Sequence, residues 1–104
     1  MAIIDDKMVK RYLQGTVDKV FKILPLYEEN NPTLKEYINS LIIELKGFVA
    51  VYGSVGIEEY ITVIATLQGL QSIIDSKGNQ PVVKREVFKS IEMVNKISNL
   101  LEGG

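Results

Sequence analysis

The sequence predicts an all-α protein that folds as a single domain, an antiparallel up-down-up-down four-helix bundle spanning residues 1–104. Apolar residues recur at helical spacing in four segments, turn-forming residues separate those segments, and the connections are short enough to make consecutive helices antiparallel. With 104 residues, 46% of them hydrophobic and 24% charged, the chain has the length and composition for one hydrophobic core.

The first helix is expected over residues 5–24. Asp5 and Asp6 suit its N-terminal turn, because the helix dipole favours negative charge there. Pro25 has no amide hydrogen and its ring clashes with the preceding turn, so it ends or bends a helix. We predict a kink, or a short extra turn that continues through Tyr27.

The second helix is expected over residues 33–52. Thr33 and Glu36 match the capping-box pattern, in which two side chains satisfy two unpaired amides at a helix start. Residues 48–52 also suit a β-strand, but their apolar spacing continues that of the capped segment upstream, which favours a helix. The glycine-containing segment 53–56 ends this helix.

The third and fourth helices are expected over residues 57–77 and 81–101. Glu58 and Glu59 suit the first turn of the third helix. At its other end, Gly78 is expected to adopt the left-handed conformation that closes a helix. Pro81 suits the first turn of the fourth helix, where its missing amide hydrogen is not needed.

Charged residues are almost absent from the middle of the chain. Between residues 47 and 74 only Glu58 and Glu59 are ionised, whereas the flanking segments hold the other twenty-three charged residues. The third helix therefore lacks a charged face opposite its apolar stripe. Either it is the most enclosed helix of the bundle, or it exposes an apolar patch that binds another protein or a second copy of the chain. The candidate partner-binding residues are Phe48, Tyr52, Tyr60, Val63, Ile64 and Leu67.

Three glycines, Gly15, Gly47 and Gly69, fall inside expected helices. A glycine in a helix interior costs about 1 kcal/mol relative to alanine. Ala65 and Gly69 lie one turn apart, so we expect another helix of the bundle to approach closely at this position.

The composition excludes several chemistries. The chain has no His and no Cys, which excludes Ser-His-Asp triads, histidine-containing metal motifs and thiolate catalysis. No glycine-rich phosphate-binding motif is present. Adjacent carboxylates, such as Glu28-Glu29, point about 100° apart on a helix and do not chelate a cation as a pair. We therefore expect no catalytic, metal or cofactor-binding residues, no cofactor and no small-molecule substrate.

Nucleic-acid binding is the alternative function. The expected first and fourth helices contain basic residues that could form a local cationic surface, namely Lys7, Arg11, Lys22, Lys84 and Arg85. However, the formal net charge is −1, acidic residues interrupt both basic sets, and no known nucleic-acid-binding motif is present. Nucleic acid is therefore the less favoured partner.

The chain also lacks the features of a membrane or secreted protein. Acidic residues stand where a signal peptide would have its basic region. The longest uncharged stretch, residues 60–74, is roughly five residues shorter than a membrane-spanning helix. We expect no membrane span and a cytoplasmic location.

In size, composition and expected architecture the chain resembles small helical immunity or inhibitor proteins of bacteria and their phages, a resemblance of architecture alone. It implies a small protein that acts by binding another protein. The leading hypothesis is accordingly a non-enzymatic interaction module, an adaptor, inhibitor or immunity-type protein that presents an apolar helical face.

Overall fold

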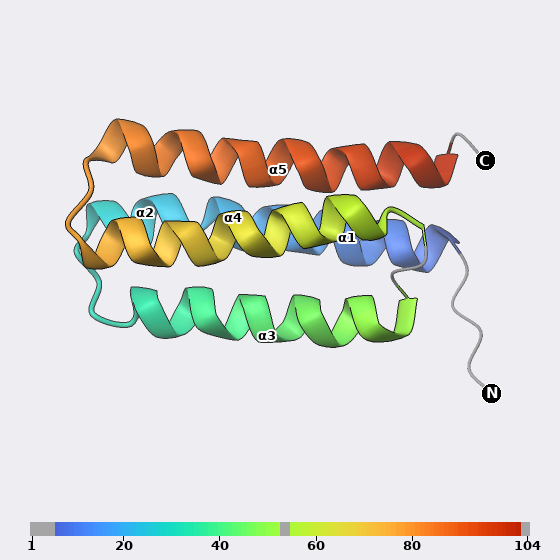
Figure 1. The fold of residues 1–104 in the computed structure, drawn as a ribbon, viewed down its shortest axis with the longest axis horizontal. Helices are drawn as coiled ribbons and strands as arrows, with labels where there is room; N and C mark the ends of the chain where they lie inside the picture. Colours follow the sequence, from blue (N-terminus) through green and yellow to red (C-terminus); the bar gives the residue numbers. More distant parts are fainter. Residues whose placement is uncertain (1–5, 53–54, 103–104) are drawn as a thin grey trace.

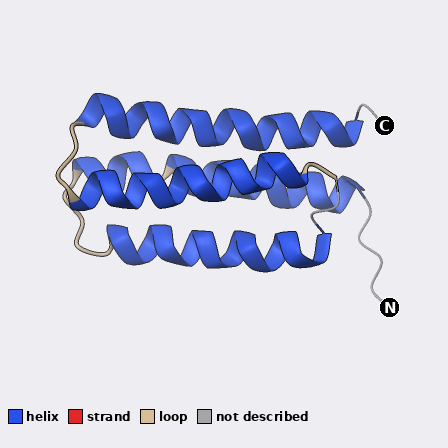
Figure 2. Cartoon of the chain, viewed as in Figure 1, coloured by secondary structure: helices blue, strands red, loops and turns tan. Residues whose placement is uncertain are grey.

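The computed structural model describes residues 6–52 and 55–102, and the described chain is helical apart from short connections (Figures 1 and 2). The elements are α1 (Asp6–Phe21), α2 (Ile23–Glu28), α3 (Leu34–Tyr52), α4 (Ile57–Asp75) and α5 (Gln80–Glu102). No described residue lies in a strand. The all-α prediction is confirmed, and residues 48–52 are helical. Residue 5, the expected first residue of the first helix, and residues 53 and 54 lie outside the described parts.

The helix is interrupted at Lys22, three residues before Pro25, so the first predicted helix is divided into α1 and α2. Helical hydrogen bonds continue on both sides of it, from the Lys22 N–H to the Asp18 carbonyl (3.2 Å) and from the Leu26 N–H to the Lys22 carbonyl (3.3 Å). Pro25 has no N–H for the Phe21 carbonyl one turn earlier. α1 and α2 together take the place of the first predicted helix, and α2 ends at Glu28, one residue beyond Tyr27.

The helices form the predicted antiparallel bundle, with long axes nearly aligned (Figure 1). α5 packs against α1 and α4, α4 packs against α3, and α2 contacts α3 and α5. The bundle measures 43 × 25 × 19 Å. The α2–α3 and α4–α5 connections lie at one end, and the α3–α4 connection lies at the other (Figure 1).

Side chains bridge α1 and α3. The rings of Tyr12 and Phe48 stack with centroids 3.9 Å apart and planes 8° apart. The Tyr37 hydroxyl donates to the Lys19 carbonyl (2.7 Å), and the Lys19 ammonium contacts the Glu44 carboxylate (2.8 Å). Aromatic and polar side chains therefore close this side of the bundle.

The buried apolar residues form one cluster to which α1 to α5 all contribute. α4 places in it Tyr60, Val63, Leu67 and Leu70, whose spacing follows one side of a helix. The remaining members are Val9, Leu13, Val20, Ile23, Leu34, Ile38, Leu41, Ile42, Leu45, Val83, Val87, Ile91, Val94 and Ile97.

Two expected helix ends differ in detail from the structure. The Thr33 hydroxyl donates to the Asn31 side-chain carbonyl (2.7 Å), which also accepts the Thr33 N–H (2.9 Å). The predicted capping box of Thr33 and Glu36 is therefore wrong, because Asn31 in the preceding turn captures the hydroxyl. At the start of α5 the Asn79 side chain accepts the Val82 N–H (3.2 Å), so the helix begins at Gln80, one residue earlier than expected.

The end of α4 also corrects an expectation. The left-handed residue is Lys77 (φ 60°), not Gly78, and the helix stops at Asp75 rather than at residue 77. The Gly78 N–H donates to the Ile73 carbonyl (2.7 Å), and the Lys77 N–H donates to the Ile74 carbonyl (3.1 Å). This is the Schellman pattern, with the left-handed residue one position before the glycine. Gly78 is needed for space, because a Cβ there would overlap the Ile73 side chain.

Candidate interaction surface

Half of the residues expected to bind a partner are core residues. Tyr60, Val63 and Leu67 are at most 1% exposed. They lie on the side of α4 that faces the bundle interior, so the prediction that they form an exposed patch is wrong. Phe48, Tyr52 and Ile64 are half-buried: Phe48 and Ile64 pack against the core, and the Tyr52 ring contacts that of Phe48 at a centroid distance of 5.2 Å.

Exposed isoleucines lie instead on the outward sides of α3 and α4. Ile43 is 61% exposed, Ile57 42% and Ile61 58%. On α4, Ile57, Ile61 and Ala65 follow one another at four-residue intervals and therefore lie along one line of the helix. We call the exposed apolar residues, alanines and glycines of these two helices the α3–α4 face, and they are Ile43, Gly47, Ala50, Val51, Ile57, Ile61, Ala65 and Gly69.

Two contacts set the register between α3 and α4. At one end the Lys35 ammonium lies 2.8 Å from the Asp75 carboxylate. Toward the other end the Phe48 and Tyr60 ring centroids lie 6.1 Å apart. In this antiparallel register Ala50 is level with the start of α4 and Ile43 is level with its middle. The exposed apolar residues of the two neighbouring helices therefore lie at comparable heights along the bundle.

The α4 part of this face is uncharged over most of its length. No ionised residue occurs in α4 between Glu59 and Asp75. Both of these carboxylates face neighbouring helices: Glu59 lies 3.8 Å from Lys96 of α5, and Asp75 pairs with Lys35 of α3. An uncharged, largely apolar line of α4 is therefore exposed to water, which is unusual for the outer side of a bundle helix.

No steric contact within the chain requires glycine at the two glycine positions of the α3–α4 face. A Cβ placed on Gly47 or Gly69 would meet no atom within 4 Å, and the same holds for Gly15 of α1. The expectation that another helix of the bundle packs closely against Ala65 and Gly69 is therefore wrong. Both residues point outward, and space remains beside them.

The basic residues of the nucleic-acid alternative are all exposed but do not form one group. Along α1, Lys7 lies about 22 Å and Arg11 about 16 Å from Lys22. The Phe21 and Phe88 rings meet edge to face with centroids 5.6 Å apart, which brings the Lys22 end of α1 next to α5. Of the three candidate basic residues before α3, only Lys22 therefore lies toward the end of α5 that contains Lys84 and Arg85. The Arg85 guanidinium lies 3.4 Å from the Glu86 carboxylate.

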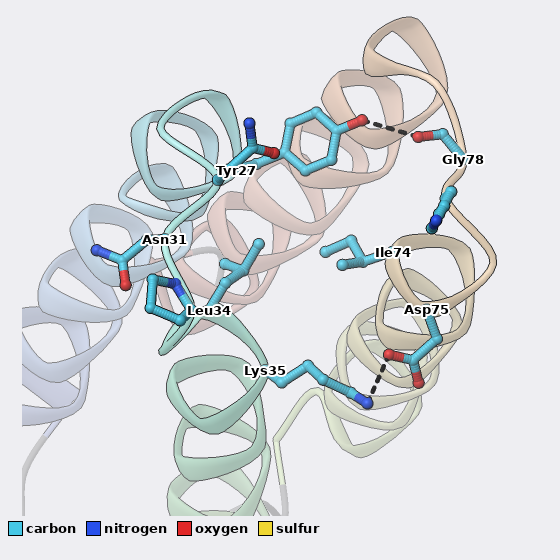
Figure 3. Close-up of a pocket in the computed structure, with 10 residues that line it drawn as sticks. Tyr27, Asn31, Leu34, Lys35, Ile74, Asp75 and Gly78 are labelled. Carbon is cyan, nitrogen blue, oxygen red and sulfur yellow. Dashed lines mark hydrogen bonds and ion pairs between the residues drawn. The ribbon is translucent and has the colours of Figure 1, made fainter.

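A pocket of about 550 Å³ lies between the α2–α3 and α4–α5 connections (Figure 3). The Tyr27 hydroxyl donates to the Gly78 carbonyl (2.7 Å), and Lys35 pairs with Asp75 at its edge. Leu34 and Ile74 supply apolar surface to it (Figure 3). Tyr27, Lys35 and Asp75 therefore hold the two connections together, which is a structural role.

Burial raises the pKa of three tyrosine side chains. Removal from water raises the pKa of Tyr12 to about 12, with a further increase from Glu44 and a partial decrease from Thr16. Burial likewise raises the pKa of Tyr60 to about 12, with a smaller contribution from Tyr12. The pKa of Tyr37 is raised by burial and by Glu44. All three phenols are therefore neutral near pH 7.

Within residues 6–52 and 55–102, no group of three or more His, Cys, Asp or Glu side chains is placed to hold a metal ion. No helix in this part of the chain combines the length and the apolar character needed to cross a membrane. Comparison of the chain with models of known families, with curated proteins and with solved structures finds no match.

The charge-poor composition of residues 47–74 indicates that the third helix is unusual, but the candidate residues Tyr60, Val63 and Leu67 lie on its buried side. The apolar residues of α4 also include Ile57 and Ile61, so its apolar stripe is very wide. A stripe that covers more than half of the helix circumference cannot be wholly buried against two neighbours. That width was the available signal, but it does not identify which apolar residues face water.

Proposed function

We propose that the protein is a non-enzymatic protein–protein interaction module that binds an apolar helical surface through the α3–α4 face. The observation that supports the proposal is the uncharged line of α4, where Ile57 and Ile61 are exposed side by side on a 19-residue helix. Contiguous apolar surface of this kind on a small protein marks interaction sites.

The composition of the face suits a helical partner. Burial of one isoleucine side chain stabilises a complex by roughly 1.5–3 kcal/mol. Gly47, Ala50, Ala65 and Gly69 present little side-chain volume, so the backbone of a partner helix can approach closely between the isoleucines. Helices pack in this way when the ridges of one enter the grooves of the other.

A matched pair of substitutions tests this function. Ile61→Lys places a charge on the face, and Phe88→Lys places the same charge on an exposed apolar position of α5 that pairs with Phe21 instead. Circular dichroism first verifies that both variants fold. In affinity capture from lysate of the source organism, we expect a partner that the wild type and Phe88→Lys retain and that Ile61→Lys loses. Capture that is unaffected by Ile61→Lys would contradict the proposal.

A second candidate function follows from the exposed Phe21–Phe88 pair beside Lys22, Lys84 and Arg85. Exposed aromatic rings next to cations are the combination on which single-stranded nucleic acid stacks. If this surface binds RNA or DNA, fluorescence anisotropy with labelled single strands detects binding at low salt that weakens as salt rises and is lost in Phe88→Ala. Absence of binding at low salt would exclude it.

A further inference from the structure

We infer that the occupant of the α3–α4 face is a second copy of this chain, packed so that the two α4 helices run antiparallel with Ala65 of each copy at the two-fold axis. This inference rests on the proposed function, because it uses the same face. It also specifies the partner and the residue at the centre of the contact.

The exposed line of α4 tapers along the helix. It begins with the bulky Ile57 and Ile61, passes Ala65, and continues to Gly69 and Ser72. In an antiparallel pair centred on Ala65, Ile61 of one copy lies opposite Gly69 of the other, because both are four residues from the centre. Ile57 lies near Ser72 in the same way. In a parallel pair Ile61 would meet Ile61, and the glycines would leave a gap.

Gly69 supplies an independent argument that a partner side chain packs at this position. Its position is exposed, a Cβ there would meet no atom within 4 Å, and no turn or positive φ requires a glycine in the middle of α4. Alanine would form a more stable helix at this position. A partner isoleucine seated at Gly69 accounts for the residue, since a Cβ there would then occupy the space of the incoming side chain.

The charges at the ends of α4 also favour the antiparallel arrangement. Glu58 and Asp75 lie near opposite ends of the helix. When the helices run antiparallel, Glu58 of one copy comes near Ser72 of the other, and no two carboxylates of α4 face each other. A parallel pair would place the exposed Glu58 of one copy against Glu58 of the other, which is destabilising, whereas Asp75 is paired with Lys35 in either arrangement.

The available area indicates a modest affinity. A 19-residue helix is about 28 Å long, and two neighbouring helices of about 10 Å diameter give a face of roughly 560 Å². Stable interfaces bury about 800 Å² on each partner. We therefore expect a reversible dimer that dissociates on dilution.

Cysteine cross-linking tests the arrangement directly, because the chain contains no cysteine. Ala65→Cys places two thiols next to each other across the two-fold axis, and we expect oxidation or a short bismaleimide to yield a covalent dimer. Ile57→Cys is the control on the same line. Its two thiols would be about 24 Å apart, so it should not link to itself. A mixture of Ile57→Cys and Ser72→Cys should form the heterodimer.

Each outcome decides the inference. Self-linking of Ala65→Cys without self-linking of Ile57→Cys supports it. Equal self-linking of both variants indicates a parallel pair and overturns it. Failure of Ala65→Cys to link, together with a monomer in light scattering at the highest soluble concentration, also overturns it. In that case capture of a different protein, lost in Ile61→Lys, would still uphold the proposed function.

Gly69→Ala provides a second test, because it should stabilise the monomer and weaken the dimer. The added methyl group should raise the denaturation midpoint of the dilute monomer and raise the dissociation constant of the dimer about tenfold, by filling the space for Ile61. Gly15→Ala on α1, where a Cβ also meets nothing, is the control and should raise the midpoint without changing the dissociation constant. Unchanged dimerisation in Gly69→Ala would contradict the packing.

Discussion

At the scale of single residues, the least satisfied groups are two tyrosine hydroxyls in the core. The hydroxyl oxygens of Tyr12 and Tyr60 are buried; that of Tyr60 has no hydrogen-bond partner in the described structure, and that of Tyr12 has only a weak interaction with Thr16. A buried polar group without a partner costs about 1–3 kcal/mol. The rings themselves pack well, since Tyr12 stacks on Phe48 and Phe48 contacts Tyr60. The rings of these residues therefore stabilise the fold, and their hydroxyls weaken it.

Replacement of Tyr60 by Phe should consequently stabilise the protein. The ring contacts remain and the unpaired hydroxyl is removed, so we expect the free energy of unfolding to rise by roughly 1 kcal/mol. Tyr37→Phe is the matched control. It loses the 2.7 Å hydrogen bond to the Lys19 carbonyl and should lower the free energy of unfolding by about 0.5–1.5 kcal/mol. Urea titration measures both, and a destabilised Tyr60→Phe would show that its hydroxyl has a favourable partner.

The same tyrosines predict a loss of stability at high pH. The pKa of Tyr12 and of Tyr60 is about 12 in the folded chain and 10.0 in its ordinary environment. Folding therefore favours the neutral phenols. The resulting stability is complete below pH 10 and is lost as the pH rises toward 12. Urea titrations across this range, with tyrosinate absorbance as the probe, should show unfolding and ionisation together. Ionisation of both residues near pH 10 in a folded protein would contradict this.

At the scale of the elements, the two connections at the pocket end are closed in the same manner. After α2 the Asn31 N–H donates to the Leu26 carbonyl (3.0 Å) and Asn30 is left-handed (φ 53°). After α4, Gly78 and Lys77 occupy the same two positions. Asparagine tolerates the left-handed conformation, whereas a lysine there is strained by contact of its Cβ with the following carbonyl. The α4 end is therefore the more strained of the two.

Lys77→Gly should relieve this strain. We expect the free energy of unfolding to rise by about 1 kcal/mol, because glycine adopts positive φ without a Cβ contact. Lys77→Ala removes the same charge but keeps the Cβ, and it should give no such gain. Thermal and urea unfolding measure the difference, and equal effects of the two substitutions would assign the change to charge instead.

At the scale of the whole molecule, α4 has two apolar sides with different tasks. Its inner side packs into the shared core, and its outer side contributes to the α3–α4 face. Both sides read as apolar in the sequence. Their separation depends on where α3 and α5 lie against α4.

Two truncations on α4 should therefore differ strongly in effect. Leu67→Ala opens a cavity in the core and should lower the free energy of unfolding by about 2–5 kcal/mol. Ile61→Ala, at low protein concentration where the chain is monomeric, should change it by less than about 0.5 kcal/mol. Urea unfolding of dilute samples distinguishes the two sites. A large loss in Ile61→Ala would mean that this residue stabilises the monomer.

Much of the architecture could be read from local patterns. The apolar spacing, Pro25 and the turn residues predict the helices to within a few residues, because hydrogen bonding in a helix is local and its breakers act locally. Details at the helix ends could not be predicted, since Asn31 competes for the Thr33 hydroxyl and the Ile73 side chain fills the space beside Gly78. The apolar spacing of a helix does not predict such contacts, because they involve residues in the turns.

The all-α class, the order and approximate length of the helices, the interruption near Pro25 and the apolar character of α4 all follow from local sequence patterns. The burial of Tyr60, Val63 and Leu67 and the exposure of Ile57 and Ile61 depend on how the helices pack. Periodicity defines positions around one helix axis, whereas burial depends on how far neighbouring helices reach around it. For a helix that is apolar on more than one side, only its packed neighbours determine which side water meets.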